Sequence, residues 1–259
     1  MRPREVFGDR LAEELLAAAL GIKRVELYLY PDRLVTPSEK GQFEATIARA
    51  KRGEPPAYIL GEVEFYNVTL SVDKRVLIPR PETELMVEEI VNHLKGKKGL
   101  LWDLCTGSGC IALALKKALP NLTVVGSDLS EEALDLARYN AARNGLDVPF
   151  YKGNFLDAIS KPVDYLVTNP PYVTEEEYRQ LTLLHWEPRV ALVGGLTFYE
   201  RLAQELPAKV KPGGQVWMEI GADQGEAVCA LFSSPHYQNL SCTQDLAGHD
   251  RVISLELAG

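Results

Sequence analysis

Val163-Asp-Tyr-Leu-Val-Thr-Asn-Pro-Pro-Tyr172 is a short apolar run that ends in a rigid turn. Residues 164–168 are rich in β-forming side chains and predict a buried strand. The prolines of Asn169-Pro-Pro-Tyr172 remove two backbone donors, fix two φ angles and push the residue before each towards extended geometry. Two prolines alone would simply end a strand. The whole tetrapeptide, downstream of a glycine loop, instead favours a stiff ledge at the carboxyl end of a strand, where open α/β sheets bind their ligands.

Strand-like and helix-like segments alternate around this ledge, from residue 100 to residue 257. The predicted strands are residues 100–104, 123–127, 149–153, 164–168, 215–220, 239–243 and 251–257, and the predicted helices are residues 111–119, 131–144, 198–206 and 224–232. Such alternation predicts an α/β fold with a twisted, mostly parallel sheet and helices on both faces. The last two strands, joined by a tight link, predict an antiparallel edge.

The chain before residue 83 predicts two smaller parts. Residues 1–56 predict a small N-terminal helical domain, in which no residues form a catalytic pattern. Within residues 57–82, two short runs alternate apolar and polar side chains around Asn67, which predicts a linking β-hairpin. Residues 83–259 are then expected to form the main domain.

Composition and charge exclude several classes of protein. The chain has 259 residues, of which 46% are hydrophobic and 25% charged, as in globular proteins. No apolar run approaches the roughly 20 residues that span a bilayer, and the first residues lack a signal-peptide pattern. We therefore expect a cytoplasmic protein that makes no membrane contact, and we expect a monomer. The four cysteines show no Cys-x-x-Cys spacing and no histidine clusters with them, so no metal site is expected.

The net charge of −8 lies wholly beyond residue 75, because residues 1–75 hold equal numbers of acidic and basic side chains. A protein that binds nucleic acid through its phosphates usually has the opposite balance. The charge therefore favours a protein or small-molecule substrate, and no direct nucleic-acid binding is expected.

A glycine loop follows the first strand of the main domain. In Asp103-Leu-Cys-Thr-Gly-Ser-Gly109, the two glycines let the backbone turn sharply and approach a ligand without interference from a Cβ atom. Asp128 ends the second strand, where a carboxylate can bind both hydroxyls of a ribose. Asn154 and Phe155 follow the third strand. Phe155 either flanks an adenine or belongs to the core, and both interpretations stay open.

This loop fits two cofactors. Gly107-Ser-Gly-Cys-Ile-Ala112 satisfies the dinucleotide pattern Gly-x-Gly-x-x-Ala, which would bind NAD. No catalytic His, Lys or Tyr motif of a dehydrogenase accompanies the loop, however, and Asn-Pro-Pro-Tyr has no role in hydride transfer. Asp103, at the end of its strand, suits a sulfonium or ammonium group better than a pyrophosphate. The residues therefore favour S-adenosylmethionine over NAD.

Together these residues resemble those of a class I S-adenosylmethionine-dependent methyltransferase, and more narrowly those of the PrmC/HemK family. The resemblance covers almost the whole chain, through residues 57–61, 64–66, 77–84, 103–109, 128, 169–172, 187–189 and 194–195. Asn-Pro-Pro-Tyr is shared with DNA adenine methyltransferases and other amino methyltransferases. Pro-Arg-Pro-Glu-Thr-Glu84 is far more selective, because the related ribosomal-protein glutamine enzymes carry a different sequence there. Cys105 departs from the family, which often has glycine at this position, and Phe155 stands where some members have tryptophan.

The resemblance implies a Rossmann-like, seven-stranded fold and an enzyme. Its substrate would be the glutamine of the Gly-Gly-Gln motif in class I peptide release factors, methylated at N5 with S-adenosylhomocysteine as the product. The N-terminal helical domain would recognise the release factor. The cofactor-binding residues are expected to be Asp103, Cys105, Thr106, Gly107, Ser108, Gly109, Asp128, Asn154, Phe155 and Asn169. The substrate-binding residues are expected to be Asn169, Pro170, Pro171, Tyr172 and Arg80. For Arg80, which lies between two prolines, the alternative is that it only forms a turn of the backbone.

Catalysis is expected to depend on Asn169, Pro170 and Tyr172. A carboxamide nitrogen is a poor nucleophile because its lone pair is delocalised into the carbonyl. The side-chain oxygen of Asn169 and the carbonyl of Pro170 would each accept one N–H, which aims the nitrogen and favours the positive charge that grows on it. Tyr172 would pack on the amide plane, and no strong base is required. The alternatives are an N6-adenine nucleic-acid methyltransferase, a ribosomal-protein glutamine methyltransferase and a non-catalytic scaffold that binds S-adenosylmethionine.

Overall fold

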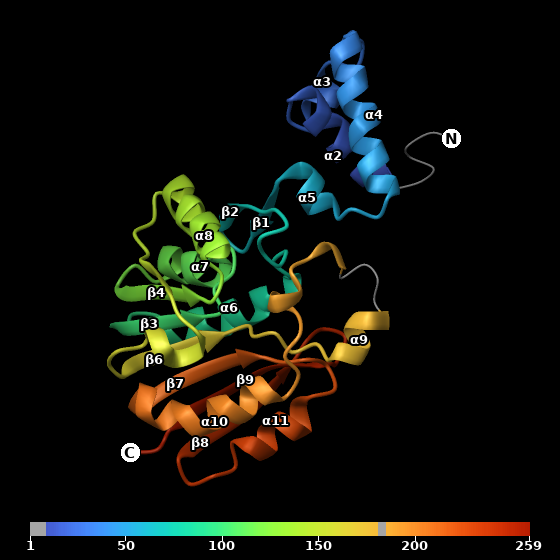
Figure 1. Ribbon diagram of the computed structural model, residues 1–259. Helices are drawn as coiled ribbons and strands as arrows, with labels where there is room; N and C mark the ends of the chain where they lie inside the picture. The colour runs from blue at the N-terminus through green and yellow to red at the C-terminus, as the bar shows by residue number, and fades with distance from the viewer. Residues whose placement is uncertain (1–8, 181–184) are drawn as a thin grey trace. The chain divides into compact units, whose positions relative to one another are not determined.

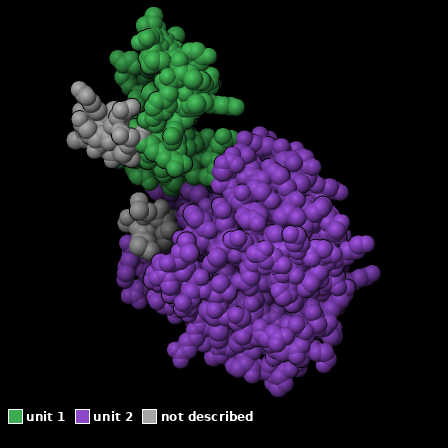
Figure 2. All heavy atoms as spheres, turned by 180° about the vertical axis from the view of Figure 1, so that it is seen from behind, with its two compact units in different colours: residues 1–63 green, residues 64–259 purple. Residues whose placement is uncertain are grey.

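In the computed structural model, which describes residues 9–180 and 185–259, the chain divides into two units, residues 1–63 and 64–259 (Figure 2). The first unit is helical, as expected, with α2 (Asp9–Leu20), α3 (Glu26–Leu29), α4 (Pro37–Lys51) and α5 (Pro56–Leu60). A capping box begins α4. The side chain of Thr36 accepts a hydrogen bond from the backbone of Glu39 at 3.3 Å, and the carboxylate of Glu39 accepts one from the backbone of Thr36 at 2.8 Å.

The predicted hairpin forms a two-stranded sheet from β1 (Glu62–Phe65) and β2 (Val68–Ser71). Tyr66, in the turn, has a positive φ of 50°, as hairpin turns require of at least one residue. Val68 and Leu70 are buried, because β2 packs against two helices of the second unit. The boundary between the two units falls inside β1.

The described part of the second unit contains a seven-stranded sheet in the order β5-β4-β3-β6-β7-β9-β8 (Figure 1). The strands are β3 (Gly99–Leu104), β4 (Leu122–Asp128), β5 (Phe150–Lys152), β6 (Val163–Thr168), β7 (Val210–Glu219), β8 (Tyr237–Gln244) and β9 (Asp250–Leu257). The first five pair in parallel, whereas β9 pairs antiparallel with both β7 and β8. This topology confirms the predicted α/β class, the seven strands and the antiparallel edge.

Helices cover both faces of this sheet (Figure 1). They are α6 (Pro81–Leu94), α7 (Cys110–Ala118), α8 (Glu131–Asn144), α10 (Thr197–Lys209) and α11 (Gly225–Leu231). The short helix α9 (Glu175–Gln180) has no buried residue, and 3-10 turns occur at Phe155–Ala158 and Arg189–Ala191. Successive side chains of β7 point to opposite faces. Met218 belongs to the core cluster that includes Tyr199 of α10, whereas the Trp217 indole nitrogen donates to Glu89 of α6 at 3.2 Å. None of the described helices is both long and apolar enough to cross a membrane.

The strand predicted from residue 215 begins five residues earlier in the structure. β7 starts at Val210 and includes the Lys211-Pro-Gly-Gly214 stretch that precedes the predicted strand. The pairing with β6 shifts from Val163–Val210 to Tyr165–Gln215, so the extra residues are accommodated as a bulge. α6 starts at Pro81, because proline at the first helical position lacks only an N–H that the helix would leave unpaired. Thr83 therefore lies in the first turn of α6.

The strand order reverses beside β3. The chain proceeds outwards from β3 through β4 to β5, and then crosses back to β6 on the other side of β3. In open α/β sheets, such a switch point leaves a crevice at the carboxyl ends of the two diverging strands. Here, those ends carry the glycine loop after β3 and Asn169 after β6.

Candidate active site

The glycine loop is built on the buried carboxylate of Asp103. Oδ2 of Asp103 accepts hydrogen bonds from the Thr106 hydroxyl at 2.6 Å and from the backbone nitrogen of Ala112 at 3.1 Å. These bonds tie the end of β3 to both the loop and the first turn of α7. Within the described part of the chain, Oδ1 of Asp103 is buried without a hydrogen-bond partner. Burial raises the pKa of Asp103 to about 7, against the hydrogen bonds from Thr106 and Ala112, which lower it.

Positive φ angles give the loop its sharp course. Gly107 and Gly109 have φ values of 54° and 82°, and a Cβ atom on Gly109 would lie 3.2 Å from the ring of Phe150. Cys105 has a φ of 62°, a conformation that costs a non-glycine residue about 1–2 kcal/mol. Glycine would adopt this conformation without that cost.

Asp128 holds the other side of the loop. Oδ2 of Asp128 accepts a hydrogen bond from the Gly107 backbone at 2.9 Å, and Oδ1 accepts one from the Ser130 backbone at 3.0 Å. Burial raises the pKa of Asp128, and these two backbone donors oppose the increase. Each carboxylate oxygen still has acceptor capacity, so Asp128 can bind hydroxyl donors from a ligand.

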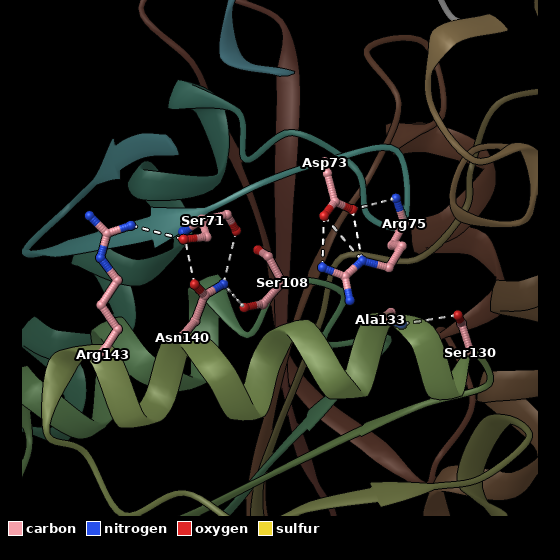
Figure 3. Close-up of polar contacts among 8 residues, drawn as sticks. All are labelled: Ser71, Asp73, Arg75, Ser108, Ser130, Ala133, Asn140 and Arg143. Carbon is pink, nitrogen blue, oxygen red and sulfur yellow. Dashed lines mark hydrogen bonds and ion pairs between the residues drawn. The ribbon is translucent and has the colours of Figure 1, made fainter. Parts of the chain in front are cut away.

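Asn140 of α8 fastens the loop to the hairpin (Figure 3). Oδ1 of Asn140 accepts from the backbone of Ser71 at 2.8 Å, while Nδ2 donates to the carbonyls of Ser71 at 3.1 Å and Ser108 at 3.0 Å. Asn140 is fully buried, so these bonds are shielded from water. The nearby Arg75 pairs through two nitrogens with Asp73, which directs the chain that follows β2.

A cavity of about 360 Å³ opens beside the loop, within the range of roughly 300–1,000 Å³ that small-molecule sites occupy. Six of the residues predicted to bind the cofactor line it, namely Cys105, Gly107, Asp128, Asn154, Phe155 and Asn169. Four others, Asp103, Thr106, Ser108 and Gly109, are not on its wall; Asp103, Thr106 and Ser108 are buried behind it. Their role is to shape the loop, and direct contact with a cofactor stays a prediction for them.

Phe155 belongs to both the cavity and the core. It lines the cavity, yet it is buried in the cluster that includes Tyr199 and contacts the ring of Phe198 edge-on at 4.8 Å. The guanidinium of Arg201 lies 4.2 Å from the centre of the Phe155 ring, close enough for a cation–π interaction. The two interpretations left open by the sequence are therefore compatible.

Sequence reasoning missed several other residues of the cavity wall. Arg75 and Arg201 are the basic ones, and Leu129, Pro188, Val190 and Phe198 are apolar. Arg75 directly precedes the Val76–Glu84 segment, which was a signal for its position. Arg201 occupies an ordinary position in α10, and no sequence signal indicated that it lies at the cavity.

Asn169 lies between this cavity and a second, smaller one of about 130 Å³. The smaller cavity is lined by Leu77, Arg80, Asn169, Pro170, Tyr172, Val173, Ala191 and Leu192. Nδ2 of Asn169 donates to the Thr83 hydroxyl at 3.2 Å, whereas Oδ1 is buried and receives no hydrogen bond from a described residue. The structure thus brings together Asn169, Pro170, Tyr172 and Arg80 around one cavity, while Pro171 faces the larger one.

The segment after residue 186 supports the Asn-Pro-Pro-Tyr ledge. The backbone of Val173 donates to Leu192 at 2.8 Å, and Gly194 donates back to Val173 at 3.1 Å. A Cβ atom on Gly194 would lie 2.1 Å from the carbonyl oxygen of Pro171, so only glycine fits there without a shift. Buried Glu187 pairs with Arg80 and also accepts from the backbone of Ile78 at 2.9 Å. Arg80 therefore both turns the chain and faces the smaller cavity.

The surroundings of the larger cavity fit S-adenosylmethionine. Asp128 offers acceptors for ribose hydroxyls, and apolar side chains offer a surface for an adenine. Where Asp103 is ionised, its unpaired Oδ1 provides a buried negative centre behind the loop that suits a cationic ligand. Among the described residues, no group of three or more acidic, histidine or cysteine side chains could hold a metal ion.

A seven-stranded sheet with a cavity of about 360 Å³ at its switch point, which shares Asn169 of the Asn-Pro-Pro-Tyr ledge with a smaller cavity, defines a class I S-adenosylmethionine-dependent methyltransferase. Solved structures agree on the fold. A methyltransferase from Pyrococcus furiosus superposes with a TM-score of 0.56 at 18% identity, covering 83% of this chain and 98% of that one. A ribosomal protein L11 methylase from Lactobacillus delbrueckii subsp. bulgaricus gives a TM-score of 0.55 at 20% identity, over 71% and 82%.

Sequence comparisons narrow this class to one family. Residues 81–185 match the family model of the methyltransferase small domain, and residues 8–61 match that of the PrmC N-terminal domain. Release factor glutamine methyltransferases from Geobacter sulfurreducens and Vibrio cholerae are each 39% identical to the chain, covering 93% of it and 87% of their own lengths. One from Chlamydia trachomatis serovar L2 is 43% identical over 80% of this chain and 74% of its own. The chain belongs to the family of release factor glutamine methyltransferases, whose methyl donor is S-adenosylmethionine.

Proposed function

We propose that this protein methylates N5 of the glutamine in the Gly-Gly-Gln motif of class I peptide release factors, and thereby tunes translation termination. The names of its relatives support the substrate. The observation that carries the chemistry is the position of Asn169, which lines both the larger and the smaller cavity and whose Oδ1 is buried without a partner within the described structure.

The smaller cavity suits a primary carboxamide. Its polar acceptors are Oδ1 of Asn169 and the carbonyl of Pro170, and two N–H donors are what a glutamine side chain offers. If each acceptor takes one N–H, the nitrogen is oriented and the positive charge that develops on it is stabilised. Tyr172, on the same wall, offers an aromatic face to the amide plane.

The larger cavity holds the methyl donor in this proposal. Bound S-adenosylmethionine supplies an electrophilic methyl group on a sulfonium. Asp128 binds the ribose, Asp103 balances positive charge from behind the loop, and Phe155 lies at the adenine. Holding both reactants in place can supply about 7–11 kcal/mol of the barrier. The newly methylated amide nitrogen is strongly acidic while it carries a positive charge and releases its N–H proton to water, so the site needs no strong base.

Several further properties belong to the same proposal. The protein acts in the cytoplasm as a monomer, its partner is the release factor, and it binds no nucleic acid directly. The last point is supported by the net charge of −8, because a protein that binds nucleic acid through phosphates usually carries excess positive charge. An adenine amine also offers two N–H donors, so N6-adenine methylation is the alternative that the test must exclude.

Intact-mass analysis tests the proposal. A class I release factor is incubated with the protein and S-adenosylmethionine, beside the same factor with its motif glutamine changed to alanine and beside a duplex oligonucleotide. We expect the mass of one methyl group to be gained by the glutamine form alone. A gain on both release-factor forms would refute the site, and a gain on the oligonucleotide would favour the adenine alternative.

A further inference from the structure

A buried carboxyl lies behind both side chains proposed to bind the substrate amide. Glu219 is the last residue of β7 and is 1% exposed. Its Oε2 accepts a hydrogen bond from the Thr83 hydroxyl at 2.6 Å, and its Oε1 accepts one from the Tyr172 hydroxyl at 3.2 Å. Glu219 faces α6, since the neighbouring Trp217, two residues earlier on β7, also contacts this helix.

Thr83 links this carboxyl to Asn169. A hydroxyl has a single proton and can accept as well as donate. Because Thr83 gives its proton to Glu219, it can only accept from Asn169, and it does so from Nδ2 at 3.2 Å. Oδ1 of Asn169 is then the end of the amide that remains for a ligand, in agreement with its lack of a partner in the described structure.

We propose that Glu219 and Thr83 are positioning residues that fix the orientation of the Asn169 amide, so that an acceptor rather than a donor faces the substrate. This inference rests on the proposed function for its consequence in turnover, but the orientation itself is a property of the free protein. With the amide reversed, Oδ1 would face a Thr83 oxygen whose proton is committed elsewhere. Nδ2 would then present its protons to the N–H donors of the substrate, and both interactions would be lost.

The same carboxyl also holds Tyr172. Its hydroxyl bonds to Oε1 of Glu219, and its carbonyl accepts from Nε2 of Gln224 at 2.9 Å. Asn169 and Tyr172 are thus oriented from opposite ends of one carboxylate. A single substitution at Glu219 therefore disturbs both side chains.

The proton on Glu219 gives this arrangement a pH dependence. Burial raises the pKa of Glu219 to about 7, while Thr83, Tyr172 and Arg251 of β9 lower it and Glu82 of α6 raises it. Tyr199 of α10 faces the same residue but donates to its backbone oxygen, at 2.7 Å. Protonated Glu219 becomes a donor towards one of its two hydroxyl partners, which removes the reason for Thr83 to act only as an acceptor.

The first test uses two substitutions at Thr83. Thr83→Val keeps the shape and removes the hydroxyl, whereas Thr83→Ser keeps the hydroxyl. We expect Thr83→Val to lower kcat on the release factor about 100-fold with the Kd for S-adenosylmethionine within about twofold, and Thr83→Ser to stay close to wild type. Thr243→Val is the matched control, because Thr243 also donates to a carboxylate of α6, that of Glu89 at 3.0 Å, and lines neither cavity. It should leave kcat unchanged.

The pH profile separates positioning from mere structural support. With S-adenosylmethionine saturating at every pH, the titration of Asp103, whose pKa is also about 7, does not enter kcat through cofactor binding. Under this condition we expect wild-type kcat to fall as the pH drops through about 7, and this step to disappear in Glu219→Gln, which cannot titrate. Equal losses in Thr83→Val and Thr83→Ser, unchanged kcat in Thr83→Val, or a pH step that persists in Glu219→Gln would each overturn the inference.

A substrate-free measurement keeps the inference testable if the proposed function fails. Wild-type protein that binds S-adenosylmethionine but methylates no release factor would refute the function alone. The side-chain ¹⁵N–¹H₂ resonance of Asn169, assigned by its loss in Asn169→Asp, reports the hydrogen bond to Thr83 directly. We expect its protons to exchange slowly in wild type and Thr83→Ser and to lose this protection in Thr83→Val, and protection unaffected by Thr83→Val would overturn the orientation.

Discussion

The backbone nitrogen of Gly107 lies 2.9 Å from Oδ2 of Asp128, so the loop after β3 and the carboxylate at the end of β4 fix each other. The backbone nitrogen of Ser130, the N-cap of α8, donates a hydrogen bond to the other carboxylate oxygen, Oδ1 of Asp128, at 3.0 Å. Asp128 lines the larger cavity in an orientation set before any ligand arrives. Such preorganisation lets a carboxylate bind a ribose without first losing side-chain freedom.

Asp128→Asn should weaken binding of S-adenosylhomocysteine. An amide presents a donor where a carboxylate presents a second acceptor, so one ribose hydroxyl loses its partner at a cost of about 1–3 kcal/mol. We therefore expect the Kd, measured by isothermal titration calorimetry, to rise roughly 5–150-fold. Asp157→Asn, at an exposed position outside the cavity, should leave the Kd unchanged. Wild-type affinity in Asp128→Asn would remove Asp128 from the cofactor site.

Asn169→Ala should abolish turnover while cofactor binding survives. The substitution removes the acceptor at the junction of the two cavities but leaves the loop, Asp128 and Phe155 in place. We expect kcat to fall at least about 100-fold and the Kd for S-adenosylmethionine to change by less than about threefold. Calorimetry and single-turnover methylation measure the two quantities, with Asn121→Ala at an exposed turn as control. Loss of cofactor binding in Asn169→Ala would contradict its assigned role.

Local sequence signals predicted most of the elements, whereas long-range hydrogen bonds could not be predicted. The predicted helix 131–144 matches α8, because Ser130 caps its start and Gly145 takes the left-handed conformation at its end. The strand after residue 163 is equally local, being an apolar run that two prolines terminate. Thr83, in contrast, is 86 residues from Asn169 and 136 from Glu219. Only the pairing of strands and the packing of α6 on them bring these three together.

For the candidate site, too, the sequence predicted some features and not others: it indicated which residues belong to the site, but not which of them line the cavity. The motifs named Asp128, Asn154, Phe155 and Asn169, and the structure places these four on the cavity wall, because each lies at or after the carboxyl end of a parallel strand and such ends meet at one edge of the sheet; their contact with the cofactor stays a prediction. The motif also included Asp103, whose side chain the structure directs behind the loop. Pattern alone does not distinguish a residue that contacts the ligand from one that holds the contacting backbone.

Cys105 should tolerate glycine better than alanine. At its φ of 62°, any side chain costs about 1–2 kcal/mol, while glycine loses about 0.5–1 kcal/mol through the entropy of the unfolded chain. The free energy of unfolding in urea should therefore be higher for Cys105→Gly than for Cys105→Ala. At Cys229, inside α11, the same pair should show the opposite order, because alanine favours helix by about 1 kcal/mol. Finding alanine preferred at both positions would show that the loop carries no strain at Cys105.

Asp103→Asn should change how stability depends on pH. The carboxyl has a pKa of about 7 in the folded chain against an ordinary value of 3.8, so between these values the folded state binds more protons than the unfolded state. The free energy of unfolding contributed by Asp103 is therefore complete below pH 3.8 and is lost as the pH rises to about 7. Asparagine cannot titrate and removes this loss.

The pH-dependent part is isolated by comparing wild type with Asp103→Asn in urea at pH 5 and pH 8. Effects of the substitution that do not depend on pH are the same at both pH values and cancel. The free energy of unfolding of the variant, relative to that of wild type, should therefore be higher at pH 8 than at pH 5 by roughly 1–3 kcal/mol. Its affinity for S-adenosylmethionine should fall, because the buried negative charge behind the loop is gone, and calorimetry at pH 8 measures this separately. A stability difference that is the same at both pH values would show that Asp103 stays ionised in the folded protein, held by Thr106 and Ala112 more strongly than burial opposes it.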